Sequence, residues 1–178
     1  LVAPYSFMNT GYLVGEIMSS EVVSASPETK IIEAAKIMAD KKIGSVVVVI
    51  FSKVAGIITE QDLTRKVLAK GIDAKEKTIE EIMSKNIQTI EPEKDIYEAV
   101  SLMGNNEIKH LPVVSDGKLV GIITAKDIIK IEPGLIDLLN FKSSENSRRL
   151  KDEKDSNKDE DFAKEEGLMF DEEMENGA

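Results

Sequence analysis

The 178-residue sequence contains no cysteine, and aromatic residues make up only 4% of it. Without cysteine the chain has no disulfide framework, no thiolate zinc site and no cysteine nucleophile, so we expect a cytoplasmic protein. No apolar run approaches the roughly 18 to 20 residues of a membrane helix, and the N-terminus lacks the basic-then-apolar layout of a signal peptide. These absences predict a soluble protein with no membrane partner.

Basic residues are outnumbered, and the net charge is -10. Much of the excess lies in Phe141–Ala178, which carries 13 acidic and 7 basic residues. Phosphate-backbone binding needs a basic face, and the chain offers no aromatic platform or zinc-finger spacing, so a nucleic-acid partner is not expected. Residues 141–178 have too few apolar side chains to offset the entropy of ordering, which predicts a disordered acidic tail. Leu168–Phe170 is interpreted as a chance apolar triplet in that tail, with a partner-docking motif as the alternative.

Sequence motifs of the common enzyme classes are missing as well. The chain has no Walker lysine motif, no Gly-x-Gly-x-x-Gly, no His-Glu-x-x-His and no Gly-x-Ser-x-Gly. We therefore predict a protein that is not an enzyme, with no catalytic residues, no metal site and no catalytic cofactor.

An internal repeat appears when the sequence is compared with itself at a shift of 65 residues, without gaps. Glu-Ile-Met-Ser occurs at Glu16–Ser19 and again at Glu81–Ser84. Gly-Ile-Ile-Thr-x-x-Asp occurs at Gly56–Asp62 and at Gly121–Asp127. The repeat predicts a first unit at 13–72 and a second at 73–140. Residues 1–12 form an N-terminal extension, whose start suggests a cloning remnant because Met8 is a plausible native start.

Each unit is expected to fold as β-α-β-β-α, which places the protein in the α/β (α+β) class. Ser26-Pro27 predicts a helix start, and Asp116-Gly117 predicts a hairpin turn. A short strand is expected near Val22 and Val23, and near Ile87 in the second copy. A unit of about 55 residues has little interior, so we expect the two to pack their sheets with pseudo-two-fold symmetry around a shared core. The apolar stretch Leu135–Phe141 is expected to dock on this body or on a neighbour.

The Gly-Ile-Ile-Thr-x-x-Asp motif has two interpretations. In one it is a capping box, with the Thr hydroxyl and the Asp carboxylate satisfying backbone amides at a helix start. In the other the same geometry serves a ligand, because a helix N-terminus attracts phosphate and a carboxylate can accept both hydroxyls of a ribose. The two roles are compatible.

The paired units resemble a CBS-domain pair, also called a Bateman module, over about Leu13 to Ile131. The resemblance rests on Glu-Ile-Met-Ser, the Ser-Pro and Glu-Pro helix starts, the stretch Ile108–Val114 and the two Gly-Ile-Ile-Thr-x-x-Asp motifs. It implies a regulatory, energy-sensing module that binds an adenine nucleotide such as AMP, ADP or ATP, with S-adenosylmethionine and NAD as alternatives. It also implies a homodimer that acts on a separate effector protein. The competing hypothesis is a structural or dimerisation adaptor that binds no nucleotide.

The resemblance also assigns residues to two clefts between the repeats. Asp62 and Asp127 would bind ribose, Thr59 and Thr124 would lie near ribose or phosphate, and Ile57 and Ile122 would flank adenine. The opposite repeat would supply the Asp62 cleft with Thr89, Lys109, His110 and Lys126. It would supply the Asp127 cleft with Ser24, Gly44, Ser45 and Gln61.

The two clefts are therefore expected to differ. The Asp62 cleft gains two lysines and a histidine, which predicts the stronger binding of phosphorylated nucleotides there. Two departures from the family pattern weaken the case for phosphate at the Asp127 cleft: Val47 replaces a proline, and Phe51-Ser52 replaces an acidic-glycine turn. A lone histidine at a strand entry, such as His110, is more often a packed polar residue than a ligand residue, and only the resemblance reverses this and makes it a ligand residue.

Overall fold

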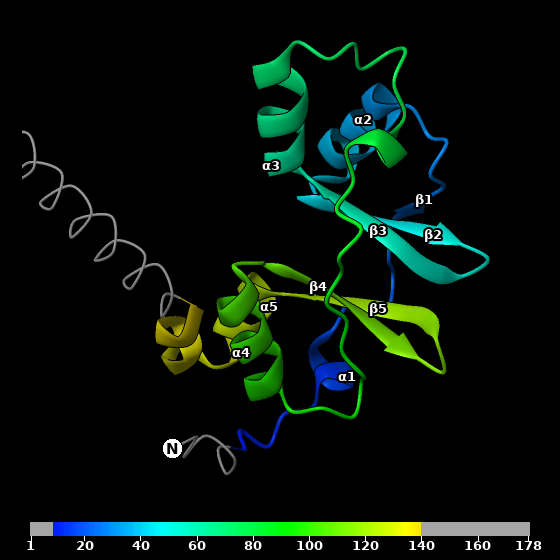
Figure 1. Ribbon diagram of the computed structural model, residues 1–178. Coiled ribbons are helices and arrows are strands. Elements are labelled where there is room, and N and C mark those ends of the chain that lie inside the picture. The colour runs from blue at the N-terminus through cyan, green and yellow to red at the C-terminus, as the bar shows by residue number, and fades with distance from the viewer. Residues whose placement is uncertain (1–8, 140–178) are drawn as a thin grey trace, which may run out of the picture. The chain divides into compact units, whose positions relative to one another are not determined.

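The computed structural model describes residues 9–139, so the predicted tail at 141–178 lies outside the described residues, as do residues 1–8 of the predicted extension. Two tandem repeats of mixed helices and strands follow one another along the chain (Figure 1). The first contains α1 (Val14–Ile17), β1 (Ser24–Ala25), α2 (Ile31–Lys41), β2 (Ser45–Ile50), β3 (Lys53–Thr59) and α3 (Glu60–Asp62), which continues into a π-helix (Leu63–Val67) and a 3-10 turn (Leu68–Lys70). The second contains a 3-10 turn (Ile79–Glu81), α4 (Ile96–Asn106), β4 (His110–Ser115), β5 (Lys118–Thr124), α5 (Ala125–Ile131) and a 3-10 turn (Pro133–Leu135).

The sheets of the two repeats differ by one strand. The first has the order β1-β2-β3, with β1 parallel and β3 antiparallel to β2, whereas the second is the antiparallel pair β4-β5. In the first repeat the Val47 amide donates to the Val23 carbonyl at 3.2 Å. The equivalent position is Pro112, which has no N–H, and there only Ile90 bridges to Val113. The departure at Val47 thus lengthens the parallel pairing.

The short strand forms later in the sequence than predicted. The strand is Ser24–Ala25, not Val22–Val23, because the bond from Val47 to Val23 places the next two residues opposite Val47 and Val48. In the second copy the bridge is at Ile90 and not at Ile87.

The predicted helix start at Ser26-Pro27 is also wrong, because α2 begins at Ile31. Ser26 and Pro27 instead form a turn, in which the Thr29 amide donates to the Ser26 carbonyl at 3.1 Å. The Pro27 and Thr29 carbonyls then accept from Glu80 and Ile79 of the 3-10 turn that opens the second repeat. These bonds join residues far apart in sequence, so local helix signals could not reveal them.

The hydrophobic interior consists of two clusters, so the expectation of one shared core is wrong. One cluster combines Val14 of α1 with residues of the second repeat, and the other combines residues of the first repeat with Ile79 and Ile82. Each Glu-Ile-Met-Ser segment therefore packs on the other copy, and α1 contacts β5 (Figure 1). Between the clusters β3 contacts β5, and Val47 is fully buried outside both.

Each Glu-Ile-Met-Ser segment packs on the other repeat through a contact between its methionine and a glycine, and we call these two segments the exchanged segments. The Met18 side chain lies against Gly121, and the Met83 side chain lies against Gly56, so closely that a Cβ on either glycine would collide with the sulfur. Backbone bridges between Ser19 and Ile122 and between Ser84 and Ile57 run beside these contacts. The glycines of the two Gly-Ile-Ile-Thr motifs are therefore required by packing.

Residues 135–139 dock, as predicted, on the cluster that combines Val14 with the second repeat; Leu135 is buried in this cluster, and Leu138 and Leu139 pack against it. Phe141, the end of that predicted stretch, lies outside the described residues. No helix within residues 9–139 is long and apolar enough to span a membrane.

Candidate functional site

The capping box forms at both copies of the motif. At the start of α3, Asp62 Oδ2 accepts from the Thr59 amide at 2.9 Å and from Thr59 Oγ1 at 2.8 Å, and Thr59 Oγ1 accepts from the Asp62 amide at 3.3 Å. At the start of α5 the corresponding distances between Thr124 and Asp127 are 3.1, 2.6 and 3.3 Å. Both carboxylates are thus held in one orientation at the end of a strand.

A backbone hydrogen bond joins each motif to the residue just before the first strand of its hairpin, β2 or β4. The Glu60 amide donates to the Gly44 carbonyl at 3.1 Å, and the Ala125 amide donates to the Lys109 carbonyl at 3.0 Å. Residues that precede β2 and β4 therefore lie beside the motif of their own repeat as well as facing the other repeat.

A pocket of about 500 Å³ adjoins the first motif. This volume is within the range of small-molecule sites. The first repeat contributes β3, α3 and the entry to β2, and the second contributes the segment before Ile90 and the link from α4 to β4. The lining residues are Gly44, Ile57, Thr59, Glu60, Gln61, Asp62, Ser84, Asn86, Ile87, Gln88, Asn106, Glu107, Ile108, Lys109 and His110.

The predicted site residues divide between this pocket and other positions. Of those assigned to the Asp62 cleft, the pocket brings together Ile57, Thr59, Asp62, Lys109 and His110. Thr89 and Lys126 are exposed and are not among the lining residues. Gly44 and Gln61, assigned to the Asp127 cleft, line the Asp62 pocket instead.

The remaining residues of the predicted Asp127 cleft belong to both repeats, with Ser24 and Ser45 on β1 and β2 of the first and Ile122, Thr124 and Asp127 on β5 and α5 of the second. Ser24 is exposed on β1, and Ser45 is 7% exposed at the start of β2, opposite Thr59. Ile122 and Thr124 are half-buried on β5, where Thr124 pairs with His110 and precedes Asp127. None of these residues lines the pocket beside Asp62.

Sequence reasoning missed several polar residues of the pocket. Glu60 was visible as a variable position of the Thr-x-x-Asp motif, but Asn106 and Glu107, at the end of α4, had no signal linking them to Asp62. With Asp62 these glutamates place three carboxylates against one lysine, Lys109. The charge of the lining is therefore more acidic than the predicted set suggested.

His110 contributes little positive charge to this balance. Burial lowers the pKa of His110 below its ordinary value of 6.5; Lys109 lowers it further, while Glu60 and Asp127 act in the opposite direction. At neutral pH the imidazole is thus largely uncharged. Its Nε2 lies 3.2 Å from the place a Cβ would take at Gly44, so glycine permits this close approach of the two repeats.

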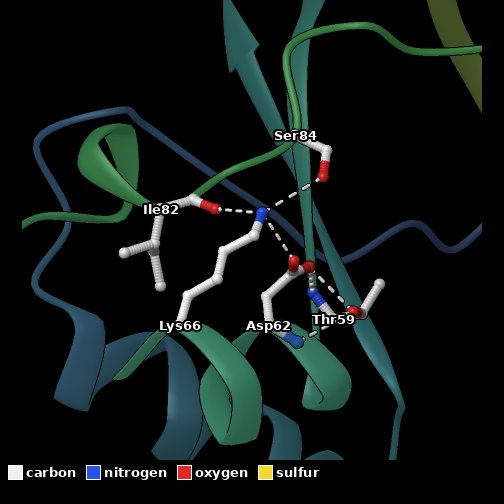
Figure 2. Close-up of polar contacts among 5 residues, drawn as sticks. All are labelled: Thr59, Asp62, Lys66, Ile82 and Ser84. Carbon is white, nitrogen blue, oxygen red and sulfur yellow. Dashed lines mark hydrogen bonds and ion pairs between the residues drawn. The ribbon is translucent and has the colours of Figure 1, made fainter. Parts of the chain in front are cut away.

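Asp62 has a further partner that sequence reasoning missed (Figure 2). The Lys66 ammonium lies 2.7 Å from Asp62 Oδ1 and donates to the Ile82 carbonyl at 2.8 Å and to Ser84 Oγ at 3.5 Å. The four-residue spacing of Asp62 and Lys66 is the available sequence signal for the ion pair. The described residues contain no group of histidine, aspartate or glutamate side chains that could hold a metal ion.

Comparison with known proteins identifies the repeat. The family model of the CBS domain matches the chain twice, over residues 14–69 and 79–134. An uncharacterized protein of Methanopyrus kandleri is 42% identical over 125 residues, which are 69% of this chain and 64% of that protein. The chain therefore spans less than two thirds of that relative.

Solved structures share the fold. The CBS domain pair of protein MJ0100, in complex with 5′-methylthioadenosine and S-adenosyl-L-methionine, matches with a TM-score of 0.63 and 35% identity, over 69% of this chain and 97% of that one. A hexameric CBS-CP12 protein from bloom-forming cyanobacteria matches with a TM-score of 0.62 and 32% identity, over 66% of this chain and 69% of that one.

Proposed function

Because this chain belongs to the CBS domain family, we propose that it is a non-catalytic regulatory module that binds an adenosine-containing ligand in the pocket beside Asp62. The observation that carries the proposal is the pocket itself, in which the Thr-x-x-Asp motif of one repeat meets Ile108–His110 of the other. Its volume suits a nucleoside, and a related CBS pair holds two adenosyl ligands.

The lining suggests a role for each part of the ligand. Ile57, Ile87 and Ile108 supply apolar surface for the adenine ring, and Asp62 supplies acceptors for the ribose hydroxyls. Lys109 is the cationic donor available to a phosphate, and the side-chain amides of Gln61, Asn86 and Gln88 can donate as well. The predicted second cleft, around Asp127 with Ser24, Ser45, Ile122 and Thr124, would bind a second ligand in the same manner.

The charge of the lining further indicates which adenosine ligands bind best. Lys109 is the single cation in the lining, Glu60 lines the same pocket, and Asp62 is already paired with Lys66, so each added phosphate brings negative charge that only one lining cation can balance. We therefore propose that adenosine, AMP and S-adenosylmethionine bind the Asp62 pocket more tightly than ADP or ATP. An energy-sensing role would use this discrimination between AMP and ATP.

Calorimetric titration tests the proposal with adenosine, AMP, ADP, ATP, NAD and S-adenosylmethionine. Two further ligands, 2′-deoxyadenosine and guanosine, probe the ribose and the base. We expect saturable binding of adenosine, weaker binding of 2′-deoxyadenosine, and affinity that declines from AMP to ATP. A Thr59→Val/Asp62→Ala variant, checked for folding, serves as the site control. If no adenosine ligand binds, the chain is a structural adaptor and the proposal is wrong.

Regulation requires a partner. We propose a homodimer that acts on a separate effector protein, and a related CBS protein is described as hexameric. Sedimentation with and without adenosine measures the assembly, and a change in association state with ligand would show how the ligand signal is transmitted.

A further inference from the structure

Lys66 is the feature beside the pocket that has no equivalent in the second repeat. At the shift of 65 residues, Asp62 corresponds to Asp127 and Lys66 corresponds to Ile131. Lys66 lies in the π-helical turn Leu63–Val67, whereas the second repeat has the regular helix α5 at this point. π-helical turns are rare in proteins, and those that occur are often found at functional sites.

The Lys66 ammonium occupies an acceptor that a ribose would need. A carboxylate has about four acceptor positions, two on each oxygen. Asp62 Oδ2 already accepts two hydrogen bonds from Thr59, and Oδ1 accepts from Lys66. About one position remains, whereas a ribose diol brings two hydroxyl donors.

Asp127 is different in this respect. Its Oδ2 accepts the same two bonds from Thr124, but Oδ1 accepts none from any residue between 9 and 139. A diol could use both positions on that oxygen without displacing a protein group.

Lys66 also connects Asp62 to the chain between the repeats. All three donors of the ammonium are used, by Asp62, the Ile82 carbonyl and Ser84 Oγ, so none is left for a ligand. Ser84 exchanges backbone bonds with Ile57 of β3, and both residues line the pocket. The Lys66 side chain is 37% exposed, so it can move into water when it leaves the carboxylate.

We propose that Lys66 gates the Asp62 carboxylate, and this rests on the proposed function of the pocket. An adenosine ligand binds with both ribose hydroxyls only after it displaces the ammonium from Oδ1. Displacement removes one of the three contacts that hold the Lys66 ammonium between α3 and the Ile82–Ser84 segment. Binding of a ligand in the pocket therefore weakens the attachment of Lys66 to the chain that connects the two repeats. The Asp127 cleft has no such competition.

The test compares the Asp127→Asn/Lys66→Met double variant with the Asp127→Asn single variant, which serves as the reference because its second cleft is weakened in the same way. The probes are adenosine, which is uncharged, and 2′,3′-dideoxyadenosine, which lacks the diol. We expect Lys66→Met to bind adenosine about two- to fivefold more tightly, the scale of a partly exposed ion pair. Dideoxyadenosine should bind both proteins equally.

Arg65→Met is the matched control, since it removes one positive charge from the adjacent exposed position and should leave adenosine affinity unchanged. Lys66→Gln provides a second variant if Lys66→Met does not fold. Unchanged or weaker adenosine binding by folded Lys66 variants, with the wild type still binding, overturns the gate and leaves the proposed function standing. If neither wild type nor variants bind adenosine, the proposed function itself fails and the gate fails with it.

Discussion

The two aspartates of the repeated motif sit in the same local geometry but in different surroundings. Both close a capping box with the preceding threonine, and the corresponding bonds differ by only a few tenths of an ångström. Beyond the box, Asp62 is paired with Lys66, whereas Asp127 has Ile131 at the matching position. The comparison teaches that identical motifs can present different numbers of free acceptors to a ligand, because neighbouring positions of the helix are free to vary.

Replacing each aspartate in turn gives the largest effect on this comparison. We expect Asp62→Ala to reduce adenosine affinity at its pocket by about 1.5 to 3 kcal/mol, the scale of hydrogen bonds to a charged group. Asp127→Ala should leave that pocket unchanged. Each variant also loses a cap, worth about 1 kcal/mol of folding stability, so urea denaturation must accompany the calorimetry. Equal loss of affinity in both variants would contradict the assignment of the pocket to Asp62.

The exchanged Glu-Ile-Met-Ser segments offer a test in the packing. Gly56→Ala and Gly121→Ala should each lower the free energy of unfolding by about 1 to 3 kcal/mol, the usual cost of overpacking. We expect the larger loss at Gly121, where the new Cβ also meets the Ser19 carbonyl at 3.1 Å, whereas at Gly56 its three nearest atoms all belong to the flexible Met83 side chain. Denaturant melts measure both. Met83→Ala combined with Gly56→Ala should recover part of the packing strain, and failure to do so would place the cost in the backbone.

The two hairpin turns differ in sequence but not in conformation. Phe51 and Ser52 have φ of 49° and 65°, and Asp116 and Gly117 have φ of 49° and 74°. Left-handed backbone is costly for phenylalanine and is natural for Asp-Gly. The double substitution Phe51→Asp/Ser52→Gly should therefore stabilise the fold by about 1 kcal/mol. The reverse exchange, Asp116→Phe/Gly117→Ser, is the control and should destabilise it; a melting temperature that does not rise in the first variant would count against the strain.

The smallest effect concerns pH and His110. Because the pKa of His110 is lowered in the folded protein, the unfolded chain takes up the proton first as pH falls below 6.5. The stability that the neutral imidazole contributes is therefore complete above pH 6.5 and is lost as pH falls from there toward the lowered value. Chemical denaturation across this range, compared with His110→Gln, measures the difference. A wild type whose stability declines no faster than that of the variant would show that burial leaves His110 unperturbed.

The same lowered pKa revises what His110 does for a ligand. The predicted positive charge at the Asp62 cleft rested on Lys109, His110 and Lys126. Lys126 does not line the pocket, and His110 is largely neutral at neutral pH. A count of charged residues along a sequence takes no account of burial, which lowers the pKa of His110, or of whether a side chain lines the pocket, as Lys126 does not. The predicted set therefore assigned this cleft more positive charge than its lining carries.

The repeated pattern was sufficient to predict the two tandem units, the capping boxes, the Asp116-Gly117 turn and the family. Each depends on residues within a few positions of one another, where backbone geometry follows directly from side-chain chemistry. Only the tertiary structure decided that each Glu-Ile-Met-Ser segment packs on the opposite copy, that Glu107 lies in the pocket beside Asp62, and that Lys66 bridges Asp62 to Ile82 and Ser84. The first two contacts join segments separated by tens of residues, and Lys66 precedes Ile82 and Ser84 by 16 and 18 residues, so none of these partners follows from a local preference of the backbone.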